Sequence, residues 1–328
     1  MNKRALLAAG TLILASVLMV TNSGATTNTR SVSPAATNVS GLLDLGRPII
    51  LGHAAGENVA PHSTIYGYSE AVKAGVDVID IDIQRTKDNV LIVQHDATVD
   101  RTTETTGNTA DLTYAQIHKL DNSYWFSSTC AGTCTNQPEA NYDFRGVRTG
   151  DKKPPKGYSA EDFSVVKFSD VAKRWPKYVL NIEIKGTAPD ALITAKLLSK
   201  EITKLKRTNS AVVTSFDDTV VDAFHKLQPK VAMSPGLEVM TAYFLQNKPV
   251  PKWERILQVP PVYEGTTVFN ADFAARTKAD GLLNWVWPNG EGEDVAGYLV
   301  LLQQGADGIN ASDPAAGVAA LKEFRRRK

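Results

Sequence analysis

The chain has 328 residues, of which 43% are hydrophobic and 22% charged, and its 36 basic and 35 acidic residues give a formal net charge of +1. This composition argues against a disordered chain and fits one large or two ordinary globular domains. Because nucleic-acid-binding proteins normally carry a strong basic excess, the near-neutral charge argues against a nucleic-acid partner.

The N-terminus has the three parts of a secretory signal peptide. Lys3 and Arg4 precede an apolar run over residues 5–20, and small residues follow it. We expect residues 1–25 to be removed and the protein to be secreted to the extracellular space or the cell envelope, with no integral membrane segment after cleavage. Residues 26–46 are rich in Thr, Ser, Asn and Ala and are expected to form a linker.

Short apolar segments alternate with longer helix-compatible segments through the rest of the chain. This alternation predicts an α/β protein with a parallel sheet. The apolar segments are residues 48–54, 76–83, 90–96, 178–185, 210–216, 230–236, 255–261, 281–287 and 305–311.

The second and third segments are separated only by the sequence QRTKDN, which is too short for a parallel crossover. We therefore expect a hairpin that turns near Asp88 and Asn89. The remaining segments predict a (β/α)₈ TIM barrel over residues 47–328. An open doubly wound sheet is the alternative, but no glycine-rich phosphate loop follows the first strand.

Residues 120–167 interrupt this alternation with an aromatic, polar and proline-containing stretch. We expect a loop insertion over one end of the barrel, either as a structural cap or as a source of substrate contacts. Cys130 and Cys134 lie within it and are expected to form a disulfide, since the chain carries an export signal.

Histidine, acidic and lysine side chains fall at the carboxyl ends of the first four apolar segments, where barrel active sites lie. Alternate residues of a strand share one face, so Asp80 and Asp82 lie side by side. Neighbouring carboxylates that are partly desolvated require a raised pKa, a cation from the protein or a metal ion. The residues at these strand ends are His53, Asp80, Asp82, His95, Asp96, Glu183 and Lys185.

The residues themselves leave two interpretations of this cluster open. Because oxygen ligands suit hard cations, the carboxylates predict one divalent cation, Ca²⁺ or Mg²⁺. Lys185 could instead neutralise Glu183 without any metal. Asp96 either orients a nearby histidine or is a turn residue. Histidine, with an ordinary pKa of about 6.5, is the residue type that exchanges protons at neutral pH.

The run AGVDVIDIDIQRTKDNVLIVQHDATVDRTTETTG at residues 74–107 resembles the most specific block of the glycerophosphodiester phosphodiesterases, which are related to the sphingomyelinase D and phospholipase D toxins. The segments LNIEIKG, TSFD and GADGI are similar to later segments of that family, in the same order. The resemblance covers nearly all of the chain after residue 25. It implies a TIM barrel that hydrolyses a phosphodiester with a divalent cation.

The resemblance also assigns roles residue by residue. Asp80, Asp82 and Glu183 match the metal ligands, His53 and His95 match the two catalytic histidines, and Lys185 matches a lysine near the phosphate.

The first motif, HAAGENVAPHST at residues 53–64, departs from the family. Ala54 replaces the arginine that would contact phosphate, and His62 replaces a glutamate. We therefore expect more dependence on Lys185, and substrate contacts from His62, Trp125 and Trp285.

The expected function is exported, metal-dependent hydrolysis of glycerophosphodiesters to an alcohol and glycerol phosphate, with histidine acid–base catalysis. The substrate is a small-molecule or lipid-derived phosphodiester, and the sequence makes no prediction of the oligomeric state. Two alternatives stay open. One is head-group release with formation of a cyclic phosphate, as in the phospholipase D toxins, and the other is a non-catalytic binding protein on the same scaffold.

Overall fold

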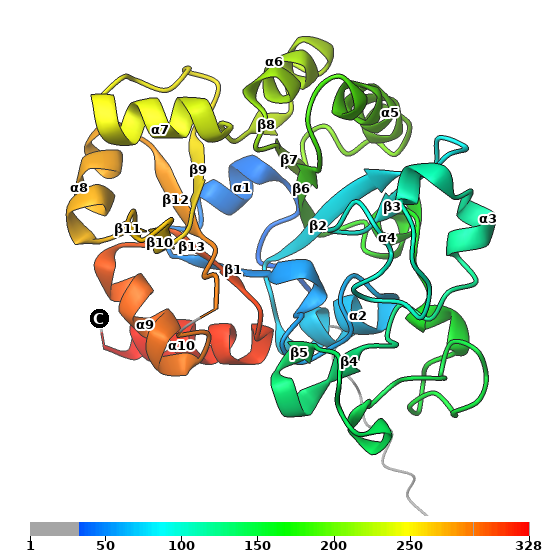
Figure 1. Cartoon of the computed structure of the whole chain (residues 1–328). Coiled ribbons are helices and arrows are strands. Elements are labelled where there is room, and N and C mark those ends of the chain that lie inside the picture. Colours follow the sequence, from blue (N-terminus) through cyan, green and yellow to red (C-terminus); the bar gives the residue numbers. More distant parts are fainter. Residues whose placement is uncertain (1–32, 291, 328) are drawn as a thin grey trace, which may run out of the picture. The chain divides into compact units, whose positions relative to one another are not determined.

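Eight parallel strands form a nearly closed barrel in the computed structural model, which describes residues 33–290 and 292–327. The order around the barrel is β8-β7-β6-β2-β1-β13-β12-β9, and a bridge between Met233 and Glu254 joins its two ends. The predicted TIM barrel is confirmed (Figure 1). Its strands are β1 (Ile49–Gly52), β2 (Val78–Arg85), β6 (Val179–Ile184), β7 (Ala211–Thr214), β8 (Ala232–Met233), β9 (Ile256–Val259), β12 (Leu283–Val286) and β13 (Gly308–Ala311).

The predicted hairpin is also present. Strand β3 (Leu91–Val93) pairs antiparallel with the end of β2, so that Val93 lies opposite Ile83. Asn89 has a φ of 61° in the connecting turn, a conformation that asparagine adopts more readily than most residues. The hairpin carries the chain back towards the barrel mouth at His95.

Helices surround the strands (Figure 1). Most of the longer ones begin at a polar residue whose side chain accepts a hydrogen bond from the first turn, for example Thr64, Asp217, Asn270 and Asp313. The helices are α2 (Ile65–Ala74), α3 (Tyr114–Ile117), α4 (Phe168–Arg174), α5 (Asp190–Lys204), α6 (Asp218–Leu227), α7 (Leu237–Gln246), α8 (Ala271–Ala279), α9 (Val295–Gln304) and α10 (Pro314–Arg326).

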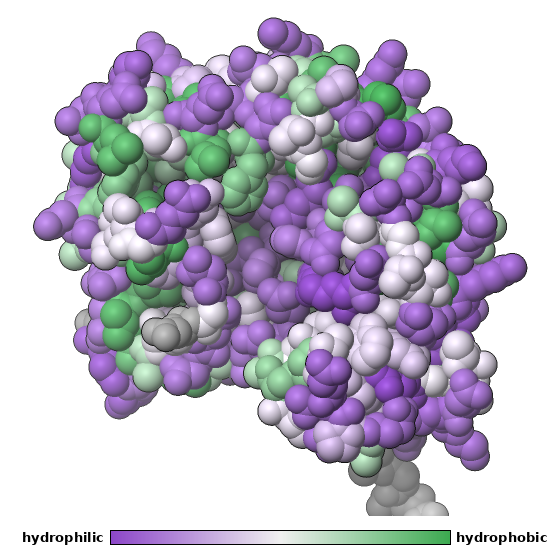
Figure 2. All heavy atoms as spheres, in the orientation of Figure 1, coloured by the Kyte–Doolittle hydropathy of each residue, from purple (hydrophilic) through white to green (hydrophobic). Residues whose placement is uncertain are grey.

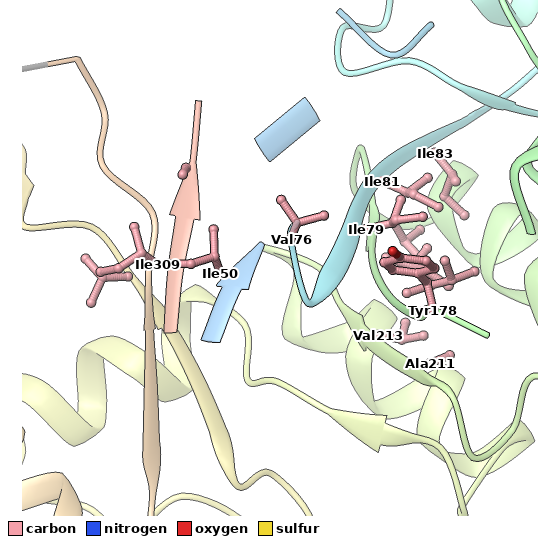
Figure 3. Packing of buried hydrophobic residues seen from close by; sticks show 14 of the residues in the cluster. Ile50, Val76, Ile79, Ile81, Ile83, Tyr178, Ala211, Val213 and Ile309 are labelled. Atoms are coloured by element: carbon pink, nitrogen blue, oxygen red, sulfur yellow. The ribbon is translucent and has the colours of Figure 1, made fainter. Parts of the chain in front are cut away.

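The alternation of β2 divides its side chains between two environments. Ile79, Ile81 and Ile83 are fully buried in the layer between barrel and helices (Figure 3). Val78, Asp80 and Asp82 occupy the other face of the strand, inside the barrel. The barrel interior therefore changes from apolar to charged along this one strand.

The described part of the predicted linker, residues 33–46, contains a short helix that was not expected, α1 (Val39–Leu43). Val39 and Leu42 are buried in an apolar cluster with Ile49, Leu51 and other residues near the amino ends of the strands. Figure 1 shows α1 within the ring of strands. The segment is polar overall, but it contains two features of a short helix. Asn38 caps the helix, and Val39 and Leu42 share one of its faces. The predicted signal peptide, residues 1–25, lies outside the described residues.

The insertion of residues 120–167 contains short elements packed beside α2. Tyr66 of α2 stacks against Phe163 and lies 4.9 Å from Phe144, measured between ring centroids. A small hairpin joins β4 (Phe126–Ser127) to β5 (Gly132–Thr133). Cys130 and Cys134 are bonded as predicted. Within residues 33–290 and 292–327, no helix combines the length and apolar character needed to cross a membrane.

Candidate active site

A cavity of about 380 Å³ opens at the carboxyl ends of the strands. Its lining includes all six side chains that the sequence predicted as catalytic or metal-binding, although they come from separate parts of the chain. The strand-end pattern thus located the cavity correctly. These residues are His53, Asp80, Asp82, His95, Glu183 and Lys185.

The register between β2 and β6 builds the floor of this cavity in layers. Val78 pairs with Val179, Asp80 with Asn181, and Asp82 with Glu183. Side chains at paired positions point to the same side of a sheet. An apolar layer, an amide–carboxylate layer and a charged layer therefore follow one another towards the mouth.

The charged layer is held together by a lysine. The Nζ atom of Lys185 lies 3.1 Å from Oδ1 of Asp82 and 2.9 Å from Oε1 of Glu183. Burial alone would raise the pKa of Asp82, but the Lys185 ammonium and the neighbouring histidines hold it below its usual value. Burial raises the pKa of Glu183, against the effect of Lys185. For Lys185, burial opposes the charged form, and the two carboxylates nevertheless raise its pKa.

Asp80 is bonded to neutral groups instead of a cation. Its carboxylate accepts hydrogen bonds from Nδ2 of Asn181 at 2.6 Å and from the backbone N–H of Ala54 at 3.4 Å. Burial, with a further contribution from the nearby Asp82 charge, raises the pKa of Asp80. Asp80 is thus the most readily protonated of the acidic pair predicted from the sequence.

His53 follows β1 in the 3₁₀ turn His53–Ala55. Its Nδ1 atom lies 3.1 Å from Oε1 of Glu57 and 3.0 Å from Oγ of Ser312, which leaves Nε2 for the cavity. Burial alone would lower the pKa of His53, but the hydrogen bond and charge of Glu57, with Asp80 and Asp82, raise it to about 9. His53 is therefore protonated at neutral pH. Glu57 is not among the site residues predicted from the sequence, where its only signal is its i+4 spacing from His53.

Glu57→Gln is expected to remove the main partner that keeps His53 protonated. If His53 donates a proton in the reaction, kcat/KM should fall above pH 9 in the wild type and above about pH 6.5 in the variant. At pH 8 the protonated fraction, and with it kcat/KM, should drop roughly 30-fold. A pH–rate profile measures this shift, with Glu161→Gln as a control that pairs only with residues outside the cavity. Identical profiles for the wild type and Glu57→Gln would contradict the role of Glu57.

His95 is held in a similar way by the next residue. Its Nδ1 atom lies 2.6 Å from Oδ1 of Asp96, and Nε of Arg101 donates to Oδ2 of Asp96 at 2.6 Å. Asp96 therefore orients a histidine, which settles the question left open by the sequence. Arg101 also lies 4.0 Å from Oε2 of Glu57. A single guanidinium thus faces the carboxylate partners of both histidines.

The structure corrects the prediction that His62 contacts substrate. His62 is 1% exposed and does not line the cavity. Its Nε2 atom lies 3.7 Å from Glu57, and its ring meets that of His95 edge-on at 6.1 Å between centroids. Burial, followed by the charge of Arg101, lowers the pKa of His62 to about 4. It is a neutral packing residue behind the two histidines that line the cavity.

Neither predicted tryptophan lines the cavity. Trp285 is 2% exposed and belongs to the apolar cluster beneath the charged layer, whereas Trp287, two residues later, does line the cavity. Trp125 donates its indole N–H to Thr103 and packs against Arg145 inside the insertion. Both predictions of substrate contact are corrected to structural roles. The sequence shows neither that Trp285 lies deep in the barrel nor that Trp125 packs within the insertion.

Comparisons with known proteins agree with this geometry. Residues 53–314 match the model of the glycerophosphoryl diester phosphodiesterase family. A glycerophosphodiester phosphodiesterase of Caldanaerobacter subterraneus is 27% identical over 271 residues, which cover 82% of this chain and 95% of that protein. A Bacillus subtilis enzyme of the same name is 29% identical over 211 residues, which cover 62% of this chain and 64% of that protein.

Two solved structures share the fold. A glycerophosphodiester phosphodiesterase from Agrobacterium tumefaciens superimposes with a TM-score of 0.58 at 19% identity, over 83% of this chain and 99% of that one. A phosphodiesterase from Oleispira antarctica, in complex with the product sn-glycerol-3-phosphate, gives 0.62 at 17% identity, over 85% and 99% of the two chains. The family match runs from the end of β1 to the start of α10 and includes all six catalytic and metal-binding residues predicted from the sequence. This chain therefore belongs to the glycerophosphoryl diester phosphodiesterase family and is a phosphodiesterase.

Proposed function

We propose that the protein is an exported, metal-dependent hydrolase that converts glycerophosphodiesters to an alcohol and glycerol phosphate. The observation that carries this proposal is the pair of histidines. His53 and His95 line the same cavity, and each has Nδ1 committed to a carboxylate. Each therefore has Nε2 available for proton transfer, with the charged layer of Asp82, Glu183 and Lys185 in the cavity beside them.

Hydrolysis requires two proton transfers at opposite sides of the phosphorus atom. Water adds its oxygen to phosphorus and loses a proton, and the bond from phosphorus to the departing alcohol oxygen breaks as that oxygen gains a proton. His95, oriented by Asp96, accepts the proton of the attacking water. His53, protonated through Glu57, donates to the departing oxygen. Lys185 stabilises the negative charge on the non-bridging phosphate oxygens.

A divalent cation fits the oxygen donors of the charged layer. The second oxygen of Asp82, Oδ2, is buried and has no hydrogen-bond partner, and Glu183 lies beside Asp82 in register. As the side chains stand, the described residues contain no group of three potential ligands, and Lys185 bridges the two carboxylates. Asp82, Glu183 and Asp80 are the residues that would hold Ca²⁺ or Mg²⁺. Such an ion would neutralise charge on the phosphate.

Addition of Ca²⁺ or Mg²⁺ should raise the free energy of unfolding, because the ion binds the folded carboxylates alone. At a free concentration of about 100 times Kd, the gain should be ~2.7 kcal/mol. Asp82→Asn removes a ligand charge at nearly constant volume and should abolish most of this gain. Chemical denaturation with each ion and with EDTA measures it, and Asp272→Asn on the exposed start of α8 is the control. Equal stabilisation of both variants would place the ion elsewhere.

Export is proposed from the signal pattern of residues 1–25. The bonded pair Cys130–Cys134 supports it, because disulfides persist mainly in oxidising compartments. Terminal sequencing of the protein recovered from outside the cytoplasm should find Thr26 as the first residue. Recovery of the full-length chain from the cytoplasm alone would contradict export.

The proposed reaction is tested by a phosphorus NMR time course over a panel of phosphodiesters, with and without EDTA. We expect a phosphomonoester from the first time point and loss of turnover after exhaustive chelation. A persistent cyclic phosphate would instead support head-group release by internal attack. Absence of any product across the panel would support a non-catalytic binding protein.

A further inference from the structure

The cavity has two chemically different sides. One side carries the histidines and the charged layer described above. The other side is apolar, and Figure 2 shows hydrophobic surface around α7 next to the hydrophilic centre of the hollow. The apolar wall of the cavity is formed by Phe216, Leu237, Met240, Phe244, Leu245 and Trp287.

Helix α7 supplies most of this apolar wall through one stripe. Leu237, Met240, Phe244 and Leu245 are spaced i, i+3, i+7 and i+8, so they lie along one side of the helix, and all four line the cavity. Tyr243 is 2% exposed and anchors the helix to the core. The helix thus has an anchoring residue and a separate stripe directed at the cavity.

Several side chains of the apolar wall are exposed to solvent, unlike the apolar side chains of the core. Leu245 is 66% exposed, Phe216 46% and Leu237 40%. Large apolar side chains that gather at one exposed concave surface mark a ligand site more often than scattered ones do. Phe216 follows β7 and meets Trp287 after β12 edge-on at 6.2 Å between ring centroids, which extends the wall along the mouth.

The polar side of the same cavity limits what the wall can bind. Lys185 is the one lysine or arginine side chain among the described residues that line it. The cations that would attract an anionic phosphate, Lys185 and protonated His53, therefore both lie on the charged side and not in the wall. A polar arm of the diester gains hydrogen bonds on the charged side, whereas an aliphatic arm gains free energy only against the wall.

We propose that this cavity takes a phosphodiester with one polar arm and one aliphatic arm, a single-chain amphiphile in monomeric form. The inference rests on the proposed function, because it assigns the second arm of the diester that the histidines cleave. The apolar side of the cavity fits one aliphatic chain, and the charged side fits the phosphate with one polar group. Two acyl chains in a bilayer would leave the second chain against charged groups or in water.

The test uses glycerophosphate diesters whose second arm is ethyl, butyl, hexyl or octyl, all below their micelle concentrations. Each methylene that is buried against the wall should raise kcat/KM by about 2–4-fold. The upper value corresponds to ~0.8 kcal/mol of transfer free energy per methylene. The double variant Phe216→Gln/Leu245→Gln should flatten this dependence. Leu227→Gln is the matched control, because Leu227 is 47% exposed on α6 but does not line the cavity.

The outcomes separate this inference from the proposed function. Hydrolysis with equal kcat/KM across the series would overturn the inference and leave the function standing. Hydrolysis only of diacyl phospholipid in vesicles would overturn both. If no diester is hydrolysed, the proposed function fails, and calorimetry of ethyl and octyl glycerophosphate diesters still decides the inference. Tighter binding of the octyl diester, lost in the double variant and kept in Leu227→Gln, supports it, and equal binding overturns it.

Discussion

The single variants His53→Ala and His95→Ala should each have a kcat about 10²–10⁴-fold lower than the wild type. Each change removes a proton-transfer group from one side of the phosphorus atom. Neither histidine is proposed as a cation ligand, so the stabilisation by Ca²⁺ or Mg²⁺ should persist. His118→Ala is the matched control. His118 is the C-cap residue of α3, stacks on Tyr114 and does not line the cavity.

The double variant His53→Ala/His95→Ala should lose little more activity than the less active single variant, since the effects of residues that act in one step are not additive. The two single variants should differ from one another with a different substrate. An aryl diester, whose alcohol leaves without a proton, should partly restore the activity of His53→Ala but not of His95→Ala. Restoration of His95→Ala instead would reverse the assignment of acid and base. Near-wild-type kcat in both single variants would remove the histidines from the mechanism.

Lys185→Met should lower kcat/KM by about 10²–10³-fold, the range found when one preorganised group that stabilises developing charge is removed. Methionine keeps most of the volume and loses the ammonium. The change also leaves Asp82 and Glu183 without their shared cation, and breaking a buried pair costs about 3–5 kcal/mol of unfolding free energy. Both effects should appear in the same variant.

Steady-state kinetics and chemical denaturation distinguish these two effects. Lys200→Met, at an exposed position on α5, is the control for the loss of one positive charge. A divalent cation should restore part of the lost stability, because Asp82 and Glu183 would again have a positive charge to bind. Activity within about threefold of wild type would show that another group neutralises the phosphate. Lost stability with unchanged kcat/KM would give Lys185 a structural role only.

Strand patterns predicted much of the fold and of the charged site for a physical reason. Alternation places Asp80 and Asp82 on one face, and the shortness of the segment after them forces the hairpin that returns His95 to the mouth. Both inferences depend on neighbours in sequence. They needed no knowledge of which strands lie across the barrel.

The features that were missed depend on depth and on distant neighbours. Trp285 lies in a strand that reaches the cavity, but only the barrel register shows that it falls below the charged layer. Glu57 lies in a loop without hydrophobic periodicity. Its role depends on its contacts with His53 and Arg101, which only the folded structure shows. The stripe of α7 follows an ordinary amphipathic pattern, which in sequence alone indicates core packing and not a cavity wall.

The layered interior of the barrel separates the residues that hold the fold from those that choose the substrate. Val78, Val179 and Trp285 fill the barrel below the amide–carboxylate layer, and the exposed stripe of α7 lies above it. Substitutions in the stripe therefore leave the deeper apolar layer intact. Single substitutions in the stripe can thus change the substrate preference. A random library confined to Leu237, Met240, Phe244 and Leu245 should yield many folded variants that differ in the alcohol they release.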